Sequence, residues 1–315
     1  MSSASPAIVC DRISKSYREV RAVQGLSLAV PTGSIYGFLG PNGSGKTTSI
    51  RMMVNILVPD EGRVLIEGEL GSERTKVRIG YLPEERGLYA KMKVRELLEF
   101  FAELKNMRAT EARAQARHWL ERMELAEWSE KTINELSKGM QQKIQFVVAV
   151  IADPPILILD EFSTGLDPIN ANLLKDVLLE LRGKGKTILF STHRMDEAER
   201  LCDHVCLINR GQKVLDGRLD EIRAAAGKAT LRVEYRGDST WLRQAPGVAQ
   251  AQEFGNYAEL KVGREAQTSA GVAAILRFLA PKLEITRFEQ LEPTLNQIFI
   301  DTVGGARLQS RSANS

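Results

Sequence analysis

The sequence predicts an α/β protein with an open parallel sheet, followed by a smaller α+β domain. Three observations favour this class. A glycine-rich loop joins an apolar stretch, Ser34 to Leu39, to the start of a helix. A second apolar stretch, Ile156 to Leu159, runs directly into two acidic residues. Beyond residue 228, short segments alternate apolar and polar residues, as strands with one wet face do.

The composition is that of an ordinary globular protein. Of 315 residues, 43% are apolar and 26% are charged, so a sizeable core and two domains are expected. The net charge is +3 with both signs interspersed, which predicts neither a nucleic-acid partner nor a polybasic membrane surface. The most apolar region, 146–159, is interrupted by Asp153 and two prolines, far short of the ~20 residues of a membrane span.

The amino-terminal end and the cysteines indicate the compartment. The first residues have neither a basic start nor an apolar run, so we expect a cytosolic chain. Three cysteines, Cys10, Cys202 and Cys206, cannot complete a disulfide set. Cys202, His204 and Cys206 lie close in sequence, and we interpret them as small buried residues in preference to a metal site.

The loop after the first apolar strand matches the pattern G-x-x-x-x-G-K-[ST]. Glycines let successive backbone N–H groups approach phosphate oxygens at the positive end of a helix. Lys46 adds a point charge and Thr47 a hydroxyl ligand for Mg²⁺. A chance match is disfavoured by the strand before the loop and the helix after it. The residues expected to bind a nucleoside triphosphate are Gly40, Pro41, Asn42, Gly43, Ser44, Gly45, Lys46, Thr47 and Thr48.

The segments around the loop predict further elements. Residues 7–30 alternate as antiparallel strands, and Tyr17 within them either stacks on adenine, which we favour, or packs on its own sheet. Residues 62–68 and 77–83 predict two more strands. From Val94 to Leu125 the apolar spacing is helical, which predicts a helical insert.

The second half of the nucleotide site follows this insert. Ser137 is placed as the N-cap of a helix that includes 144–151. At the carboxyl end of the apolar strand, Asp160 is expected to hold Mg²⁺ and Glu161 to activate water. A turn then leads into a helix over 170–182, and 186–192 forms the next buried strand. His193 ends that strand at the same sheet edge, so we expect it to contact the γ-phosphate.

With these motifs in order, residues 8 to about 222 resemble the nucleotide-binding subunit of an ATP-binding cassette (ABC) transporter. The motifs are the P-loop, the signature Leu136-Ser137-Lys138-Gly139-Met140, the Walker B end Asp160-Glu161, the D-loop Thr164-Gly165-Leu166-Asp167 and the switch His193. The resemblance implies a P-loop NTPase cassette over 7–223, with a RecA-like core, an antiparallel β subdomain and a helical subdomain at about 90–152.

The resemblance also implies the activity and the partners. The chain would hydrolyse ATP with Mg²⁺, with Lys46, Glu161 and His193 in catalysis. Two cassettes would face head to tail, so that the signature residues Ser137 and Gly139 contact the ATP held by the other copy; Asp167 of the D-loop is also expected to bind nucleotide, and we expect a homodimer. The pair would dock on a separate membrane permease, at the inner face of the cell membrane. The rival interpretation, a soluble ABC ATPase acting on ribosomes or DNA, is disfavoured by the single P-loop and the short insert.

Two departures from the family pattern stand out. Gly80-Tyr81-Leu82-Pro83 is followed by Glu84 where the family usually carries the Q-loop glutamine. Glu84 can still ligate Mg²⁺, and its extra negative charge is expected to alter metal dependence or slow hydrolysis. The signature carries Lys138 and Met140 in place of glycine and glutamine. The run from Ile79 to Tyr89 looks like the branch that serves ABC-2-type exporters, including sodium-efflux (NatA-like) systems.

The carboxyl-terminal part predicts a second domain over 228–303. The stretch Ala224 to Gly227 indicates a linker after a short helix. Strands at 230–235, 258–262 and 283–288 and helices at 269–279 and 294–303 then form an α+β unit like that appended to many exporter cassettes. It carries no catalytic cluster, so packing or support of a dimer is favoured over ligand sensing. Residues 304–315 are expected to be disordered.

Overall fold

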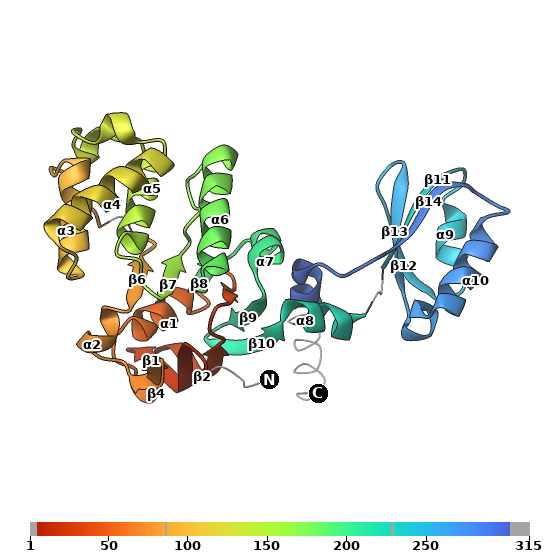
Figure 1. Ribbon diagram of the computed structural model, residues 1–315. Helices are drawn as coiled ribbons and strands as arrows, with labels where there is room; N and C mark the ends of the chain where they lie inside the picture. Colours follow the sequence, from red (N-terminus) through yellow and green to blue (C-terminus); the bar gives the residue numbers. More distant parts are fainter. Residues whose placement is uncertain (1–4, 86, 228–229, 303–315) are drawn as a thin grey trace. The chain divides into compact units, whose positions relative to one another are not determined.

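The computed structural model describes residues 5–85, 87–227 and 230–302, which divide into two compact units between Gly217 and Arg218 (Figure 1). The elements of the first unit, whose last strand ends at the boundary, are β1 (Ile8–Tyr17), β2 (Val20–Val30), β3 (Ile35–Leu39), α1 (Lys46–Met53), β4 (Glu61–Ile66), β5 (Glu69–Leu70), α2 (Glu73–Lys76), β6 (Ile79–Leu82), α3 (Val94–Leu104), α4 (Ala109–Arg122), the 3-10 turns η1 (Ala126–Trp128) and η2 (Ile133–Glu135), α5 (Lys138–Val150), β7 (Ile156–Asp160), α6 (Pro168–Gly183), β8 (Thr187–Thr192), α7 (Met195–Leu201), β9 (His204–Asn209) and β10 (Gln212–Arg218).

A six-stranded sheet in the order β10-β9-β3-β8-β7-β6 organises this unit. The pairs β9–β3, β3–β8, β8–β7 and β7–β6 are all parallel. Every residue of β3, β7 and β8 is buried, which explains why these strands are apolar on both faces. Because parallel strands end at one edge, the loops after β3, β6, β7 and β8 converge there.

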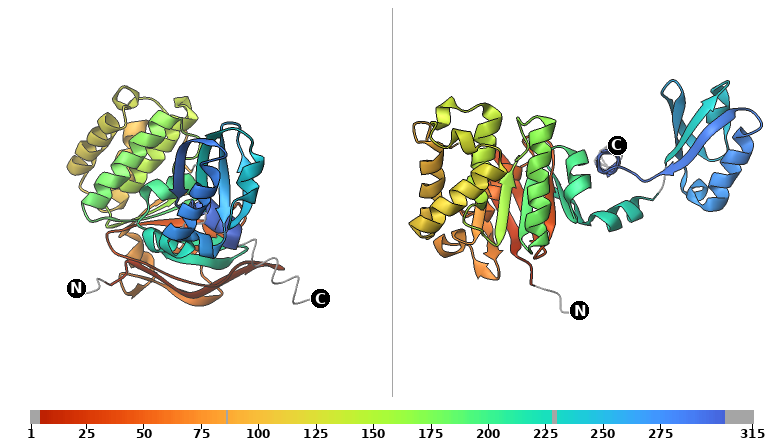
Figure 2. Two further views of the ribbon diagram at one scale, coloured as in Figure 1. Left: turned by 90° about the vertical axis from the view of Figure 1, so that its right-hand side faces the viewer. Right: turned by 45° about the horizontal axis from the view of Figure 1, so that its top comes forward.

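Successive residues of these strands enter two different cores, since side chains alternate across a sheet. Phe38, Ile158 and Leu189 pack with α1 and with the antiparallel sheet β2-β1-β4-β5. Leu157 and Phe190 pack on the other side with α5, α6 and the helices α3 and α4. Figure 2 shows α6 running beside the strands, and Figure 1 shows α3, α4 and α5 gathered together. The predicted cassette fold, with its antiparallel and helical subdomains, is thereby confirmed.

Local sequence accounts for where the helices begin. Ser137 caps α5, its Oγ accepting from the amide of Met140 at 3.2 Å, as predicted. Asp167 caps α6, and Pro168 occupies the first helical position, where its missing N–H costs nothing. The predicted helical stretch 94–125 is two helices, because the chain turns back at Asn106, which has a φ of +65°.

The second unit contains α8 (Leu219–Ala226), β11 (Thr230–Arg236), α9 (Thr240–Gln244), β12 (Val248–Glu253), β13 (Tyr257–Val262), η3 (Arg264–Gln267), α10 (Ser269–Leu279), β14 (Glu284–Leu291) and a helix over 295–302. Its antiparallel sheet has the order β12-β13-β11-β14. Leu231 and Leu260 of the sheet pack with Leu242 of α9 and with Ile275 of α10, which makes a separate core.

Some expectations for this unit were wrong. Residues 224–226 are not a linker but the last turn of α8, because alanine is the strongest helix former. Gly227, at a φ of +71°, then ends the helix. The sequence also missed α9 and β12, which are short and largely polar. The expected disorder of 304–315 and the last position of the 294–303 helix lie outside the described residues. The domain limits at 223 and 228 stay predictions.

Candidate active site

The loop from Gly40 to Thr48 joins β3 to α1 and lies close against neighbouring backbone. A side chain on Gly40 would come within 2.4 Å of the Ile208 carbonyl oxygen and 2.6 Å of Ser44 Oγ. Gly45 precedes α1 with a φ of +104°, a conformation that favours glycine, and faces the Ala22 carbonyl. The glycines are therefore needed for this loop to form, and its amides lie at the N-terminus of α1.

Two groups of this loop are suited to phosphate. Ser44 Oγ is buried and has no hydrogen-bond partner among the described residues, so it is left for a ligand oxygen. Lys46 is 6% exposed, and its Nζ donates to the carbonyl oxygens of Gly40 at 2.8 Å and Pro41 at 3.3 Å. These bonds hold the ammonium group over the loop, where it can neutralise a phosphate.

Glu161 follows β7 and connects the lysine to the switch histidine. Its carboxylate lies 3.0 and 3.1 Å from Nδ1 of His193 and 3.8 Å from Nζ of Lys46. The residue is 7% exposed and has a φ of +53°, a strained backbone conformation of the kind found at functional sites. Its amide donates to Ser191 Oγ at 3.1 Å, which holds the strained turn against β8.

Asp160, at the end of β7, has the properties of a metal ligand. It is fully buried, and burial raises the pKa of its carboxyl group. Oδ1 accepts a hydrogen bond from Ser191 Oγ, whereas Oδ2 has no partner in the described part of the chain. A buried carboxylate oxygen without a partner is costly, and a cation would stabilise it. Sequence reasoning missed Ser191, which carries no motif.

Thr47 and Glu84 complete the oxygen set. Thr47 Oγ1 donates a hydrogen bond to Glu84 Oε2 at 3.2 Å. Glu84, which stands where the Q-loop glutamine is expected, therefore lies beside the P-loop hydroxyl. Mg²⁺ takes hard oxygen ligands, typically one or two carboxylates plus substrate phosphates and water. Thr47, Asp160 and Glu84 fit that set. Within the described ranges, no group of three or more His, Cys, Asp or Glu residues is placed to hold a metal ion.

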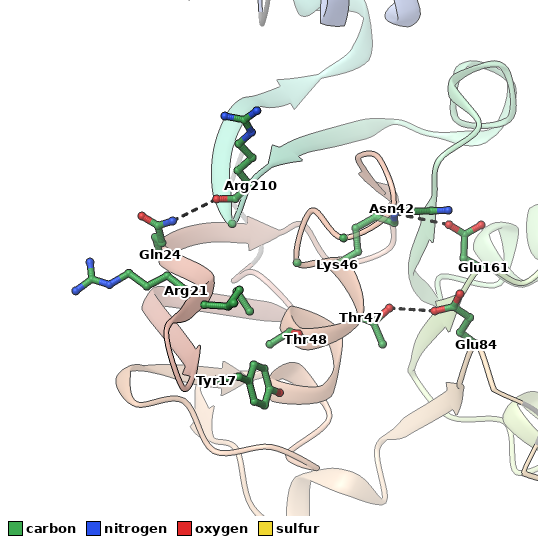
Figure 3. Close-up of a pocket in the computed structure, with 15 residues that line it drawn as sticks. Tyr17, Arg21, Gln24, Asn42, Lys46, Thr47, Thr48, Glu84, Glu161 and Arg210 are labelled. Atoms are coloured by element: carbon green, nitrogen blue, oxygen red, sulfur yellow. Dashed lines mark hydrogen bonds and ion pairs between the residues drawn. The ribbon is translucent and has the colours of Figure 1, made fainter. Parts of the chain in front are cut away.

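A cavity of about 740 Å³ is lined by Lys46, Thr47, Glu84 and Glu161 among others. Figure 3 shows Tyr17 at one side and Glu84 and Glu161 at the other, with Lys46 and Thr47 between. Tyr17 is 45% exposed, so its ring is available to a base. The lining residues are Tyr17, Val20, Arg21, Ala22, Gln24, Asn42, Gly43, Gly45, Lys46, Thr47, Thr48, Glu84, Glu161, Arg210 and Gly211.

Sequence reasoning missed the basic side of this pocket. Arg21 lies in β2 and Arg210 in the turn between β9 and β10, far apart in sequence. Gln24, also in β2, donates from Nε2 to the Arg210 carbonyl oxygen at 3.3 Å, which links β2 to that turn. No motif marks these positions, because only the tertiary fold places β2 beside that turn.

The signature and the D-loop lie outside the pocket. Ser137, Gly139 and Asp167 are absent from the described residues that line it. Gly139 leaves room for a side chain, with Leu166 Cδ2 3.6 Å from the position of an added Cβ. Asp167 Oδ1 accepts from the amides of Ile169 and Asn170, both at 3.0 Å. Asp160 and His193 do not line the pocket either, but the contacts of Glu161 with Lys46 and His193 join the P-loop, Walker B and switch residues. Within the described ranges the side-chain hydrogen bonds of Ser137 and Asp167 are local to their own helix starts.

Comparisons with known proteins identify the family of this chain. Residues 23–164 match the family model of ABC transporters, and residues 217–303 match the C-terminal domain of DrrA1-3-like ATP-binding proteins. The uncharacterized ABC transporter ATP-binding protein YhaQ of Bacillus subtilis is 41% identical, over 94% of this chain and 98% of its own length. The daunorubicin resistance ATP-binding protein DrrA3 of Streptomyces coeruleorubidus is 31% identical, over 98% of this chain and 100% of its own.

Solved structures show the same cassette fold. An ATP-binding subunit of an ABC transporter is 29% identical with a TM-score of 0.66, over 70% of this chain and 93% of its own. The cassette MJ0796, described as dimeric with bound ADP and phosphate, has 24% identity and a TM-score of 0.63, over 67% of this chain and 98% of its own. None of the helices in the described part of the chain has the length and apolar character needed to span a bilayer. The chain belongs to the ATP-binding proteins of ABC transporters, a family of ATPases.

Proposed function

We propose that this chain hydrolyses ATP in the pocket over the P-loop and that the reaction drives export through a separate membrane protein. The observation that carries the proposal is the convergence of Lys46, Asp160, Glu161 and His193 at one edge of the parallel sheet. Two relatives' names point the same way: one confers daunorubicin resistance, and another, from Paraburkholderia xenovorans, serves Nod factor export. Neither name supports an ATPase of ribosomes or DNA.

Each residue has a proposed part in the reaction. Loop amides and Lys46 bind the phosphates, while Tyr17 contacts the base. Thr47, Asp160 and Glu84 would hold Mg²⁺, which would offset charge on the phosphates. Glu161 accepts the proton of the attacking water. Nδ1 of His193 lies 3.0 Å from the Glu161 carboxylate, close enough for the imidazole to orient that carboxylate. His193, 47% exposed in its side chain, is open to a γ-phosphate.

A second copy of the chain completes the site. Ser137 lies at the positive N-terminal end of α5, and Gly139 leaves this end accessible. Since both residues lie outside their own pocket, we propose that they bind the ATP held by the partner, with Asp167 beside them. The cassette MJ0796, which has a similar fold, is described as a dimer, and this supports a pairing of two cassettes. We place the pair on the inner face of the cell membrane, bound to a permease.

The test is Glu161→Gln. The amide has the same shape but cannot accept a proton, so ATP binding should persist while kcat falls by roughly 10²–10⁴. Asp196→Asn is the control, because Asp196 is an exposed acid near His193 that pairs only with Arg194 among the described ion pairs. Wild-type turnover in Glu161→Gln would refute the role of Glu161. A monomer that hydrolyses ATP at full rate at every dilution would refute the shared site.

A further inference from the structure

Glu84 lies on an exposed loop, and packing within this loop does not hold its backbone in place. Pro83 is half-buried, whereas Glu84 and Glu85 are exposed. The loop follows β6 directly, and the hydrogen bond from Thr47 Oγ1 to Glu84 Oε2 spans 3.2 Å. A side chain on such a loop keeps one position only if the backbone beside it is anchored. The anchor must come from another element.

Gln145 of α5 supplies that anchor. Its Nε2 donates to the Pro83 carbonyl oxygen at 2.9 Å and to the Glu85 carbonyl oxygen at 3.2 Å. A side-chain amide has two N–H donors, so both are used on the two carbonyls that flank Glu84. Gln145 is 3% exposed, and its Oε1 has no partner within the described ranges. The two acceptors alone therefore set the orientation of this buried amide.

The same helix also anchors the loop of the other acidic residues. Gln142, about one turn before Gln145, donates from Nε2 to the Phe162 carbonyl oxygen at 3.0 Å, next to Glu161. α5 begins after Ser137, the signature serine. The helix α5 therefore begins at the signature. Its two buried glutamines donate hydrogen bonds to the loops that carry Glu84 and Glu161.

We propose that Gln145 is a positioning residue that holds Glu84 beside Thr47 through the backbone of Pro83 and Glu85. The inference rests on the proposed function, in which Thr47 and Glu84 face the metal bound to ATP. Without the two bonds the exposed loop loses its attachment to α5, and Glu84 leaves the place from which it acts. The part of the ATP affinity that depends on Mg²⁺ should fall, while contacts of the P-loop with the phosphates remain.

The experiment measures equilibrium binding of a fluorescent ATP analogue to the full chain, once with Mg²⁺ and once with EDTA. The readout is the dissociation constant in EDTA divided by the dissociation constant with Mg²⁺. This ratio can be measured without turnover. In Gln145→Leu, which keeps the bulk and removes both donors, we expect the ratio to fall roughly tenfold. The affinity in EDTA should stay within about twofold of wild type, since the P-loop is unchanged.

Lys143→Met is the matched control. Lys143 lies on the same helix, is 5% exposed, and donates to the Met123 carbonyl oxygen at 2.8 Å. Its loss removes a buried bond of the same kind but touches neither acidic loop, so the ratio should equal that of wild type. Gln145→Glu is the second variant, because a carboxylate is nearly isosteric but offers no donors to the two carbonyls; it should behave as Gln145→Leu does.

A double variant shows whether Gln145 acts through Glu84. In a Glu84→Ala background there is no side chain to position, so adding Gln145→Leu should change the ratio by less than about twofold. An unchanged ratio in both Gln145→Leu and Gln145→Glu, or an equal loss with and without the Glu84 side chain, would overturn the inference and leave the proposed function intact. A wild-type chain that binds no ATP with Mg²⁺ would instead reject the proposed function.

Discussion

Replacing Lys175 with methionine should destabilise the first unit, because it removes one of the two cations beside a buried carboxylate. Glu197 of α7 has a fully buried side chain, and its Oε1 lies 3.4 Å from Nζ of Lys175. That oxygen has no hydrogen-bond partner among the described residues, so its charge is balanced by Lys175 and by Arg194, 3.8 Å away. Oε2 accepts from Ser163 Oγ at 2.9 Å. Lys175→Met keeps the packing of the stem and removes only the charge.

The expected loss is about 3 kcal/mol, the lower end of the 3–5 kcal/mol typical when one member of a buried ion pair is removed. The lower end applies because the Lys175 side chain is 14% exposed and Arg194 remains. Adding Glu197→Gln to Lys175→Met should recover part of the loss, since a neutral amide needs no counter-charge. The consequence for activity is local, because Ser163 and Thr192, both within 3.4 Å of Glu197 Oε2, belong to the segments that carry Glu161 and His193.

Urea unfolding followed by tryptophan fluorescence can measure the free energy of unfolding of the first unit alone. The chain has three tryptophans, and Trp241→Phe leaves Trp119 and Trp128, both in the first unit. Lys93→Met is the control, because Lys93 forms an exposed pair with Glu130, and such pairs contribute little. A free energy of unfolding within about 0.5 kcal/mol of the parent for Lys175→Met would refute the reasoning, as would strictly additive losses in the double variant.

Three further experiments have defined outcomes. Gly40→Ala should weaken ATP binding about a hundredfold in titrations, because the new methyl would lie 2.4 Å from the Ile208 carbonyl oxygen and displace the loop; wild-type affinity would contradict this. Glu84→Gln should raise the half-saturating Mg²⁺ concentration roughly tenfold, and unchanged metal dependence and turnover would exclude a role for the carboxylate. Hydrogen bonds from Arg95, with Lys93 next, lower the pKa of Glu130 from 4.5 to about 2. The stabilisation that goes with this shift is small because Glu130 is exposed, and it is present above pH 4.5 and lost as the pH falls through 2. An NMR titration of the Glu130 carboxyl should therefore give a pKa well below its usual range, and an ordinary pKa would count against these bonds.

The recognisable parts of the site are those that one short segment specifies. The P-loop needs glycines at Gly40 and Gly45 because a Cβ there would meet backbone atoms, and this constraint is visible in the sequence itself. Asp160 and Glu161 were found because an apolar strand buried on both faces must end at the site edge of a parallel sheet. The N-cap at Ser137 is similarly local, since its bond reaches only to Met140.

The missed parts depend on contacts between distant segments. Arg21 and Arg210 share a pocket only because β2 and the β9–β10 turn meet, and Gln145 reaches Pro83 across 62 residues of sequence. The short, polar β12 and α9 have weak patterns of their own, so tertiary packing decided them. The prediction of a linker at 224–226 was wrong for a local reason. Its alanines favour helix and continue α8 from the preceding turn.

By itself the sequence indicated the cassette fold through its ordered motifs, the buried strands that end at the site and the residues expected to bind phosphate, because steric limits and burial act within single elements. Only the tertiary structure decided that Glu84 meets Thr47, that Gln145 anchors its loop, and that the signature lies apart from the pocket. These are relations between elements, and they depend on how helices and strands pack after each has formed.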